Sequence, residues 1–232
     1  MITEPSLNTA RLNTAQLSQV QKQMQLHKQC TKPFIFQPIE LGDGVSLDKM
    51  IVHPGVLWPM SSRRLAAFLY RNRAMLEGKT VIDMGSGCGL QGITAALYGA
   101  RHVILSDLTE EAYQNTLENV SRYGLTSKCE VRRGDLFERV PEAADIIVFA
   151  HPYFPGTPDP NLPFTFGMLN DGELVPRFLD QAKSHAKDRI SMCQLDLAGN
   201  VNNPHVHAPK RGYRIIEHGP ELLTTGEQQG TF

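Results

Sequence analysis

Glycine and acidic residues stand where apolar runs of the sequence end, in positions suited to ligand binding. The clearest case is the segment Asp83-Met84-Gly85-Ser86-Gly87-Cys88-Gly89, in which the glycines permit a tight turn and close approach of the backbone to a bound molecule. Its G-x-G-x-G spacing differs from the dinucleotide pattern G-x-G-x-x-G and argues against a nicotinamide dinucleotide. Asp83 is suited to an amine or another cationic group.

Two further acids end the next apolar runs. Asp107 closes HVILSD, where its carboxylate could accept hydrogen bonds from both hydroxyls of a ribose, or could instead cap the helix that follows. Asp135 in RRGDLF could accept from an exocyclic amino group of adenine. Three acids at successive strand ends, all at one sheet edge, predict a crevice for a nucleoside that carries an amino-acid-like cationic end.

The alternation of short apolar runs with helical stretches after Lys79 predicts a parallel α/β sheet. We expect strands near residues 79–85, 102–107, 129–135, 144–154, 189–198 and 211–218, and helices near 90–100, 110–124 and 173–186.

The residues before this region predict an N-terminal extension. Apolar residues recur at helical spacing over residues 13–29, and 34–41 with 45–52 read as a hairpin around the turn GDG. We therefore expect two parts: residues 1–75, a helix, hairpin and capping segment that forms a lid, and residues 76–232, a ligand-binding domain.

Composition excludes several function classes. The 232 residues carry 23 Lys and Arg against 24 Asp and Glu, so no basic excess indicates nucleic acid as a partner. No apolar run is long enough for a membrane helix, which favours a cytoplasmic protein with a small-molecule substrate. Widely spaced cysteines suggest no metal site, and His205 and His207 read as a loop or edge segment. Oligomeric state is not readable.

The glycine segment and the ordered acids resemble the class I S-adenosylmethionine-dependent methyltransferases over roughly residues 79–154. The resemblance implies a Rossmann-like sheet of about seven strands, mostly parallel, with an antiparallel last hairpin. It also implies S-adenosylmethionine as cofactor or substrate. The residues implied to hold it are Asp83, Gly85, Gly87 and Gly89 at the methionine and ribose, Asp107 and Leu108 at the ribose, Asp135 and Leu136 at the adenine, and Ala150.

The fourth strand end, DIIVFAHPYF, looks like the D-x-x-x-x-N-P-P-Y motif of glutamine and adenine N-methyltransferases. Ala150 stands at the Asn position and His151 at the first proline, so a planar amide acceptor loses the side chain that would recognise it. Tyr153 and Phe154 offer aromatic faces to a sulfonium cation, and His151 could orient a group, accept a proton or be purely structural.

The acceptor motif is altered at Ala150 and His151, whereas the residues expected to bind S-adenosylmethionine are all present. This combination predicts that the nucleophile is a group of S-adenosylmethionine itself. The whole sequence resembles the bacterial azetidine-2-carboxylate synthases of specialised metabolism, which implies cyclisation with release of methylthioadenosine. The alternatives are a methyltransferase acting on a small molecule or a protein side chain, and a non-catalytic S-adenosylmethionine-binding protein.

Overall fold

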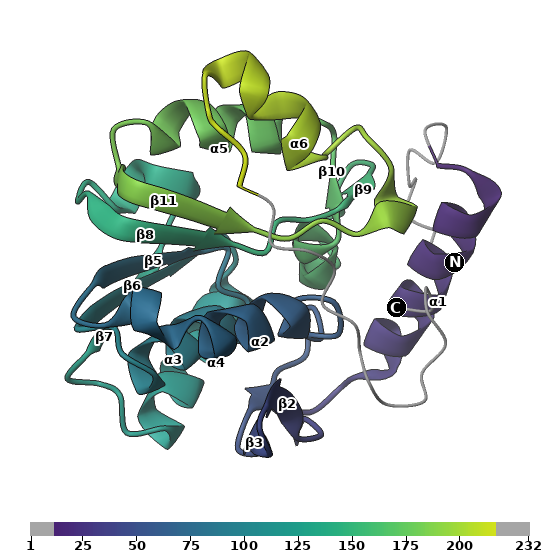
Figure 1. The fold of residues 1–232 in the computed structure, drawn as a ribbon. Coiled ribbons are helices and arrows are strands. Elements are labelled where there is room, and N and C mark those ends of the chain that lie inside the picture. Colours follow the sequence, from purple (N-terminus) through teal and green to yellow (C-terminus); the bar gives the residue numbers. More distant parts are fainter. Residues whose placement is uncertain (1–11, 217–232) are drawn as a thin grey trace.

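A parallel sheet forms the centre of the computed structural model, which describes residues 12–216 (Figure 1). In spatial order its strands are β11 (Ala186–Met192), β8 (Ala144–Phe149), β5 (Thr80–Met84), β6 (His102–Asp107) and β7 (Cys129–Arg133). All four neighbouring pairs are parallel. The α/β Rossmann-like class expected from the sequence is confirmed.

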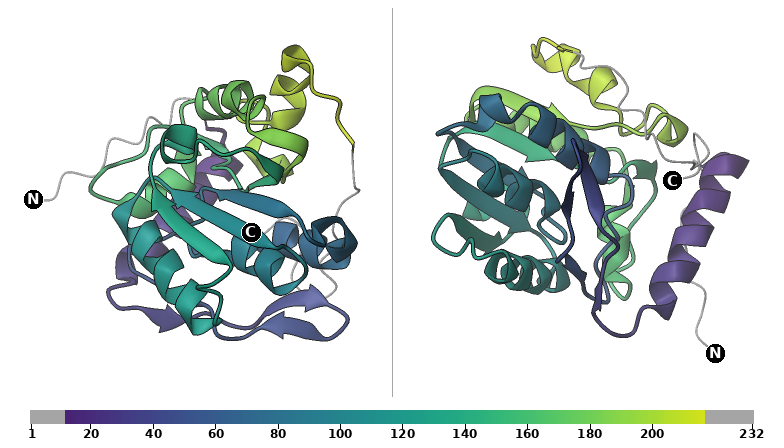
Figure 2. Two further views of the ribbon diagram at one scale, coloured as in Figure 1. Left: turned by 90° about the vertical axis from the view of Figure 1, so that its left-hand side faces the viewer. Right: turned by 60° about the horizontal axis from the view of Figure 1, so that its bottom comes forward.

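Helices cover both faces of the sheet (Figures 1 and 2). On one face lie α2 (Arg63–Arg71), α3 (Leu90–Leu97) and α4 (Glu110–Arg122), and on the other lie α5 (Leu174–Ala182) and the short α6 (Pro204–His207). The central strands β5 and β8 are almost wholly buried, which is why they read as continuous apolar runs rather than alternating ones.

The strand order reverses between β5 and β8. From β5 the chain moves outward through β6 to β7, whereas β8 and β11 are added on the opposite side of β5. In open α/β sheets the crevice at such a reversal, outside the carboxyl ends of the strands, is where ligands bind. The glycine-rich segment follows β5 and the AHPY segment follows β8, so both stand at this crevice.

The N-terminal extension has the predicted elements. Helix α1 (Thr14–Gln29) begins after Asn13, which forms a capping box with Gln16. Strands β2 (Ile39–Gly42) and β3 (Val45–Leu47) form the hairpin, and outside it β1 (Phe34–Ile35) pairs with β4 (Ile51–Val52).

The extension does not fold apart from the sheet. Phe36, Leu41 and Leu65 belong to the same hydrophobic cluster as Val81 and Ile93. The division at residues 75 and 76 stays a prediction.

Short elements complete the described chain. These are the pair β9 (Phe154–Pro155) and β10 (Leu169–Asn170), and the 3-10 helices η2 (Arg73–Leu76), η3 (Leu136–Arg139), η4 (Pro163–Gly167), η5 (Asp196–Ala198) and η6 (Pro209–Arg211).

The expected number of strands is corrected. Within residues 12–216 the central sheet has five strands rather than about seven, and no antiparallel hairpin follows β11. The chain turns instead into η5, α6 and η6, and residues 212–216 form no strand. The end of the strand expected near 211–218 lies outside the described residues.

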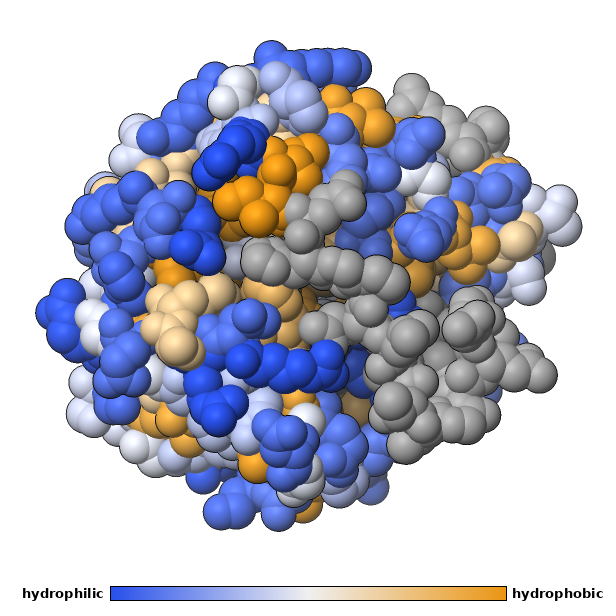
Figure 3. All heavy atoms as spheres, in the orientation of Figure 1, coloured by the Kyte–Doolittle hydropathy of each residue, from blue (hydrophilic) through white to orange (hydrophobic). Residues whose placement is uncertain are grey.

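Hydrophilic residues cover most of the face drawn in Figure 3, with apolar residues in small groups. In the described part of the chain, no helix combines the length and the apolar character needed to cross a membrane.

A buried polar face of α4 joins the N-terminal extension to the glycine-rich segment. Asn119 is fully buried; its Oδ1 accepts from the Ile51 N–H at 2.9 Å, and its Nδ2 donates to the carbonyls of Ile51 at 2.8 Å and Cys88 at 2.9 Å. Asn115 makes matching bonds to the His53 N–H and the Ile51 carbonyl. Buried backbone groups need such partners, so these side chains fix where residues 51–53 run.

We expect Asn119→Ala to lower the free energy of unfolding by about 2 to 4 kcal/mol, because the substitution strips buried backbone groups of their partner. Urea denaturation measures the change. Gln114→Ala, on the exposed side of the same helix, is the matched control and should change stability by less than about 0.5 kcal/mol. Equal effects of the two substitutions would contradict the role given to Asn119.

Candidate functional site

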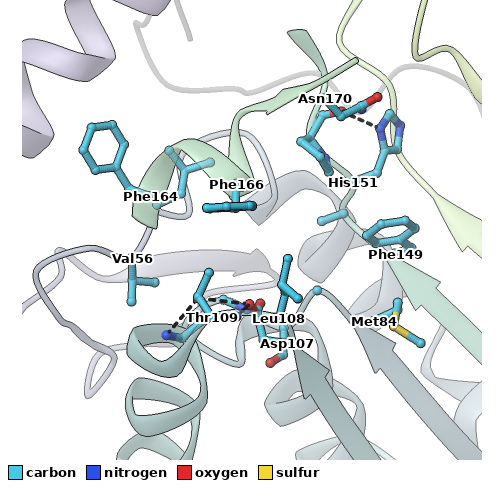
Figure 4. Close-up of a pocket in the computed structure, with 18 of the residues that line it drawn as sticks. Val56, Met84, Asp107, Leu108, Thr109, Phe149, His151, Phe164, Phe166 and Asn170 are labelled. Carbon is cyan, nitrogen blue, oxygen red and sulfur yellow. Dashed lines mark hydrogen bonds between the residues drawn. The ribbon is translucent and has the colours of Figure 1, made fainter. Parts of the chain in front are cut away.

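A cavity of about 290 Å³ lies at the carboxyl ends of the strands (Figure 4). Its lining comes from residues 55–62 of the extension, the ends of β5, β6 and β8, the start of η3, and residues 158–177. Of the residues expected to bind ligand or to react, Gly85, Gly87, Asp107, Leu108, Asp135, Leu136, Ala150, His151 and Tyr153 line it.

The glycine-rich turn is shaped by conformations that other residues rarely adopt. Gly85 has φ of 64°, and a Cβ there would meet the Phe149 ring at 3.0 Å. Gly89, with φ of 85°, is the residue before α3. Without side chains at these positions the backbone after β5 can approach a ligand closely.

Asp107 is held in place by the turn it faces. Its Oδ2 accepts from the Gly87 N–H at 2.9 Å, and its Oδ1 accepts from the N–H and hydroxyl of Thr109. Burial raises the pKa of Asp107, and these hydrogen bonds act in the opposite direction. A carboxylate has about four acceptor positions, so the fixed side chain still has capacity for a ligand hydroxyl.

Asp135 and Leu136 form the opposite rim. Arg177 of α5 binds Asp135 in a bidentate pair, Nη1 to Oδ2 at 2.6 Å and Nη2 to Oδ1 at 3.1 Å. Leu136 has φ of 49°, an uncommon backbone conformation for a residue with a branched side chain. Strain of this kind clusters at ligand sites.

The AHPY segment is rigidly held. The Pro152 carbonyl accepts from Asn170 Nδ2 at 2.8 Å and from His151 Nδ1 at 3.1 Å. Because a carbonyl only accepts, His151 carries its proton on Nδ1, and its buried Nε2 has no hydrogen-bond partner among the described residues. Burial lowers the pKa of His151 to about 4, so the ring is neutral at physiological pH.

Aromatic side chains close the remaining side. Phe166 of η4 lies across the cavity from Leu108 and Asp107, and Phe149 lies on the β8 side (Figure 4). From the sequence, Phe164 and Phe166 are expected in a loop near the cleft, either as core residues or as part of an aromatic wall. Phe164 is buried as expected, but Phe166 is only half-buried and lines the cavity.

Three of the residues expected to bind ligand or to react, Asp83, Gly89 and Phe154, do not line the cavity. Asp83 is fully buried outside the cavity lining, where its Oδ2 accepts from the Gly92 N–H of α3 at 2.7 Å. Burial raises its pKa to about 7. Gly89 shapes the turn without lining the cavity, and Phe154 points into a hydrophobic cluster with Val20 and Met24 of α1.

Helix α1 stands behind the cavity wall rather than in it. His27 is 4% exposed; its Nδ1 donates to the Gln23 carbonyl at 2.7 Å, and its Nε2 accepts from the Trp58 N–H at 2.9 Å. Its ring stacks on Phe164 and lies against Trp58, both of which line the cavity. Helix α1 therefore contacts the cavity wall from behind, and its role as a lid stays a prediction.

Among the described residues, no three His, Cys, Asp or Glu side chains gather in a way that could hold a metal ion. His205 and His207 lie on α6, not on a strand.

Comparison with known proteins identifies the family. The model of the ribosomal protein L11 methyltransferase family matches residues 67–150. A putative protein N5-glutamine methyltransferase of Methanocaldococcus jannaschii is 30% identical over 158 residues, which cover 65% of this chain and 78% of that protein. The chain belongs to the class I S-adenosylmethionine-dependent methyltransferase family, whose cosubstrate is S-adenosylmethionine.

Other relatives share only part of their length with the chain. The ribosomal protein L11 methyltransferase of Desulforamulus reducens is 38% identical over 71 residues, 31% of this chain and 23% of the relative. A crystal structure of a ribosomal protein L11 methylase from Lactobacillus delbrueckii subsp. bulgaricus aligns with a TM-score of 0.49 at 22% identity, covering 66% of this chain and 76% of that one.

We expect Asp107→Ala to weaken binding of S-adenosylmethionine by about 2 to 4 kcal/mol, roughly 30-fold to several-hundredfold, since hydrogen bonds to a carboxylate are lost. Calorimetry measures the dissociation constant. Asp188→Ala, a surface carboxylate of β11 paired with Arg189, is the control and should bind normally. Unchanged affinity in Asp107→Ala would remove that residue from the ligand site.

We expect His27 to make stability depend on pH. Burial lowers its pKa below 6.5, so its contribution is complete above about pH 6.5 and is lost as the unfolded state takes up the proton at lower pH. His27→Gln keeps an acceptor for the Trp58 N–H but does not titrate. Urea midpoints between pH 8 and 5.5 should fall less in the variant, and fluorescence of Trp58, the single tryptophan, reports the contact. Identical pH dependence in both proteins would exclude this role.

Proposed function

We propose that the protein cyclises S-adenosylmethionine to azetidine-2-carboxylate and methylthioadenosine. The observation that carries the proposal is the cavity beside Ala150, where the side chain that would bind an amide acceptor is absent. A volume of about 290 Å³ is at the low end for small-molecule sites, which favours one ligand rather than a ligand and a second substrate.

The polar groups near Ala150 support this reading because they already have partners. Asn170 lines the cavity, but its Nδ2 donates to the Pro152 carbonyl and its Oδ1 accepts from the Gly172 N–H. The Tyr153 hydroxyl contacts Cys193. Each group keeps some hydrogen-bonding capacity, but an acceptor amide would share it with the present partner rather than meet a side chain dedicated to it.

The reaction balances without a second substrate. The neutral α-amine nitrogen attacks the γ-carbon, the bond from that carbon to sulfur breaks, and the electron pair leaves with methylthioadenosine. One proton of the original ammonium group passes to solvent. The chain would bind the methionine portion in a folded conformation, exclude water, and offer the rings of Tyr153 and Phe166 to the sulfonium.

The pKa values of the cavity residues favour entry of the amine in its neutral form. Burial holds the pKa of Tyr153 well above its usual range, so it is not a base at neutral pH, while His151 has a pKa of about 4 and is a weak one. An α-amino group titrates at about pH 8, so a useful fraction of the ligand is already deprotonated under physiological conditions.

A second candidate is methyl transfer to a protein side chain. The relatives favour it, because the Methanocaldococcus jannaschii protein is named for glutamine and the Desulforamulus reducens protein for a ribosomal protein. This reaction would require the wall of residues 55–62 and 163–167 to move aside for a macromolecular substrate.

Incubation of the purified protein with S-adenosylmethionine alone, followed by mass spectrometry, tests the proposal. We expect azetidine-2-carboxylate and, above a protein-free control, an equal amount of methylthioadenosine; Asp107→Ala should form much less azetidine-2-carboxylate at a substrate concentration below its dissociation constant. The amino-acid product decides, because spontaneous decomposition also releases methylthioadenosine. S-adenosylhomocysteine formed only with an added acceptor would establish methyl transfer instead, and binding without any consumption would establish a non-catalytic protein.

A further inference from the structure

We propose that Cys193 is a positioning residue for Tyr153, its thiol fixing the aromatic ring that faces the sulfonium. The inference rests on the proposed use of that ring. Cys193 is not suggested by any sequence motif, and it lies outside residues 67–150, which the family model matches.

The register of the sheet brings the two residues together. Met192, the last residue of β11, pairs with Phe149, the last residue of β8. Cys193 therefore leaves the sheet beside Ala150, at the position from which an amide-binding side chain is missing. Tyr153 is three residues further along the same segment.

The contact between them is direct. Tyr153 Oη lies 2.8 Å from Cys193 Sγ. Burial raises the pKa of Cys193 to about 11 and holds that of Tyr153 well above its usual range, so both groups remain neutral and the contact persists across physiological pH.

Other contacts hold the backbone and one edge of the ring of Tyr153. They do not fix the position of its hydroxyl. Asn202 Nδ2 donates to the Tyr153 carbonyl at 3.1 Å, and the His151 ring meets the Tyr153 ring edge to face with centroids 5.0 Å apart. Cation–π attraction requires the ring face within about 6 Å of the cation, so a small swing of the ring weakens it. The Cys193 thiol, together with the Ser61 side chain, holds the hydroxyl end of the ring against this swing.

A double-mutant cycle on the full chain tests the inference. We expect Cys193→Ala to lower kcat for S-adenosylmethionine consumption about 3- to 10-fold and to raise its dissociation constant about 3-fold, and Cys193→Ser, which keeps a hydroxyl partner, to recover at least half of the rate. In a Tyr153→Phe background, Cys193→Ala should have no further effect, because the hydroxyl on which it acts is gone. A full additional loss in that background would overturn the inference.

A binding measurement makes the test independent of turnover. If the ring faces the sulfonium, Cys193→Ala should reduce the preference for S-adenosylmethionine over the neutral S-adenosylhomocysteine about 3-fold or more, and an unchanged preference would also overturn the inference. Cys30→Ser, at the end of α1 and outside the cavity lining, is the thiol control and should leave rate and preference unchanged. A failure of the cyclisation proposal would change the identity of the product but not the result of the double-mutant cycle, so it can be told apart from a failure of this inference.

Discussion

The hydrogen bonds from the buried face of α4 are the constraint on which the cavity depends. Asn115 and Asn119 bind the backbone of β4, while Asn119 and Thr116 bind the carbonyls of Cys88 and Gly87 in the glycine-rich turn. One helix face thus sets the distance between the turn and the segment that follows β4. Residues 55–62 follow β4 and form one wall of the cavity. The position of this wall therefore depends on the hydrogen bonds that α4 makes to residues 51–53.

The N-terminal helix and the aromatic residues around the cavity pack against this wall. Trp58 and Phe164 line the cavity, His27 joins them from behind, and Val20 and Met24 pack α1 against the same cluster. Among the described residues, helix α1 contacts the cavity lining through His27, Val20 and Met24 and does not itself line the cavity. An apolar stripe in the sequence could predict that α1 docks, but the surface on which it docks exists only after residues 153–169 have folded.

Local patterns in the sequence predicted the features that depend on local physics. Helix α1 and the hairpin agree with their patterns, and Asp107 faces the turn as a strand-end acid should. The two-residue periodicity of a strand predicts which side chains share a face of the sheet, but not which face borders the cavity. The Asp83 side chain lies on the face toward α3, where it accepts a hydrogen bond from the Gly92 N–H. The Asp135–Arg177 and Tyr153–Cys193 contacts join residues 42 and 40 positions apart, so no local pattern could reveal them. The strand expected near residues 211–218 is not part of the sheet over residues 211–216, the part of it that the structure describes.

The charge distribution around the cavity has a chemical consequence. Of the three acids expected to face the ligand, Asp107 is bonded to the turn, Asp135 is neutralised by Arg177, and Asp83 is buried with a raised pKa. Tyr153 and Phe166 line the cavity with aromatic rings, and the charged side chain that acts on Tyr153 is Arg64. A carboxylate beside a sulfonium would stabilise the ground state and lose that stabilisation when the positive charge leaves sulfur. Aromatic faces bind the cation more weakly and still accommodate the neutral thioether. Binding of the sulfonium by such rings therefore raises the activation free energy for breaking the carbon–sulfur bond less than a carboxylate would.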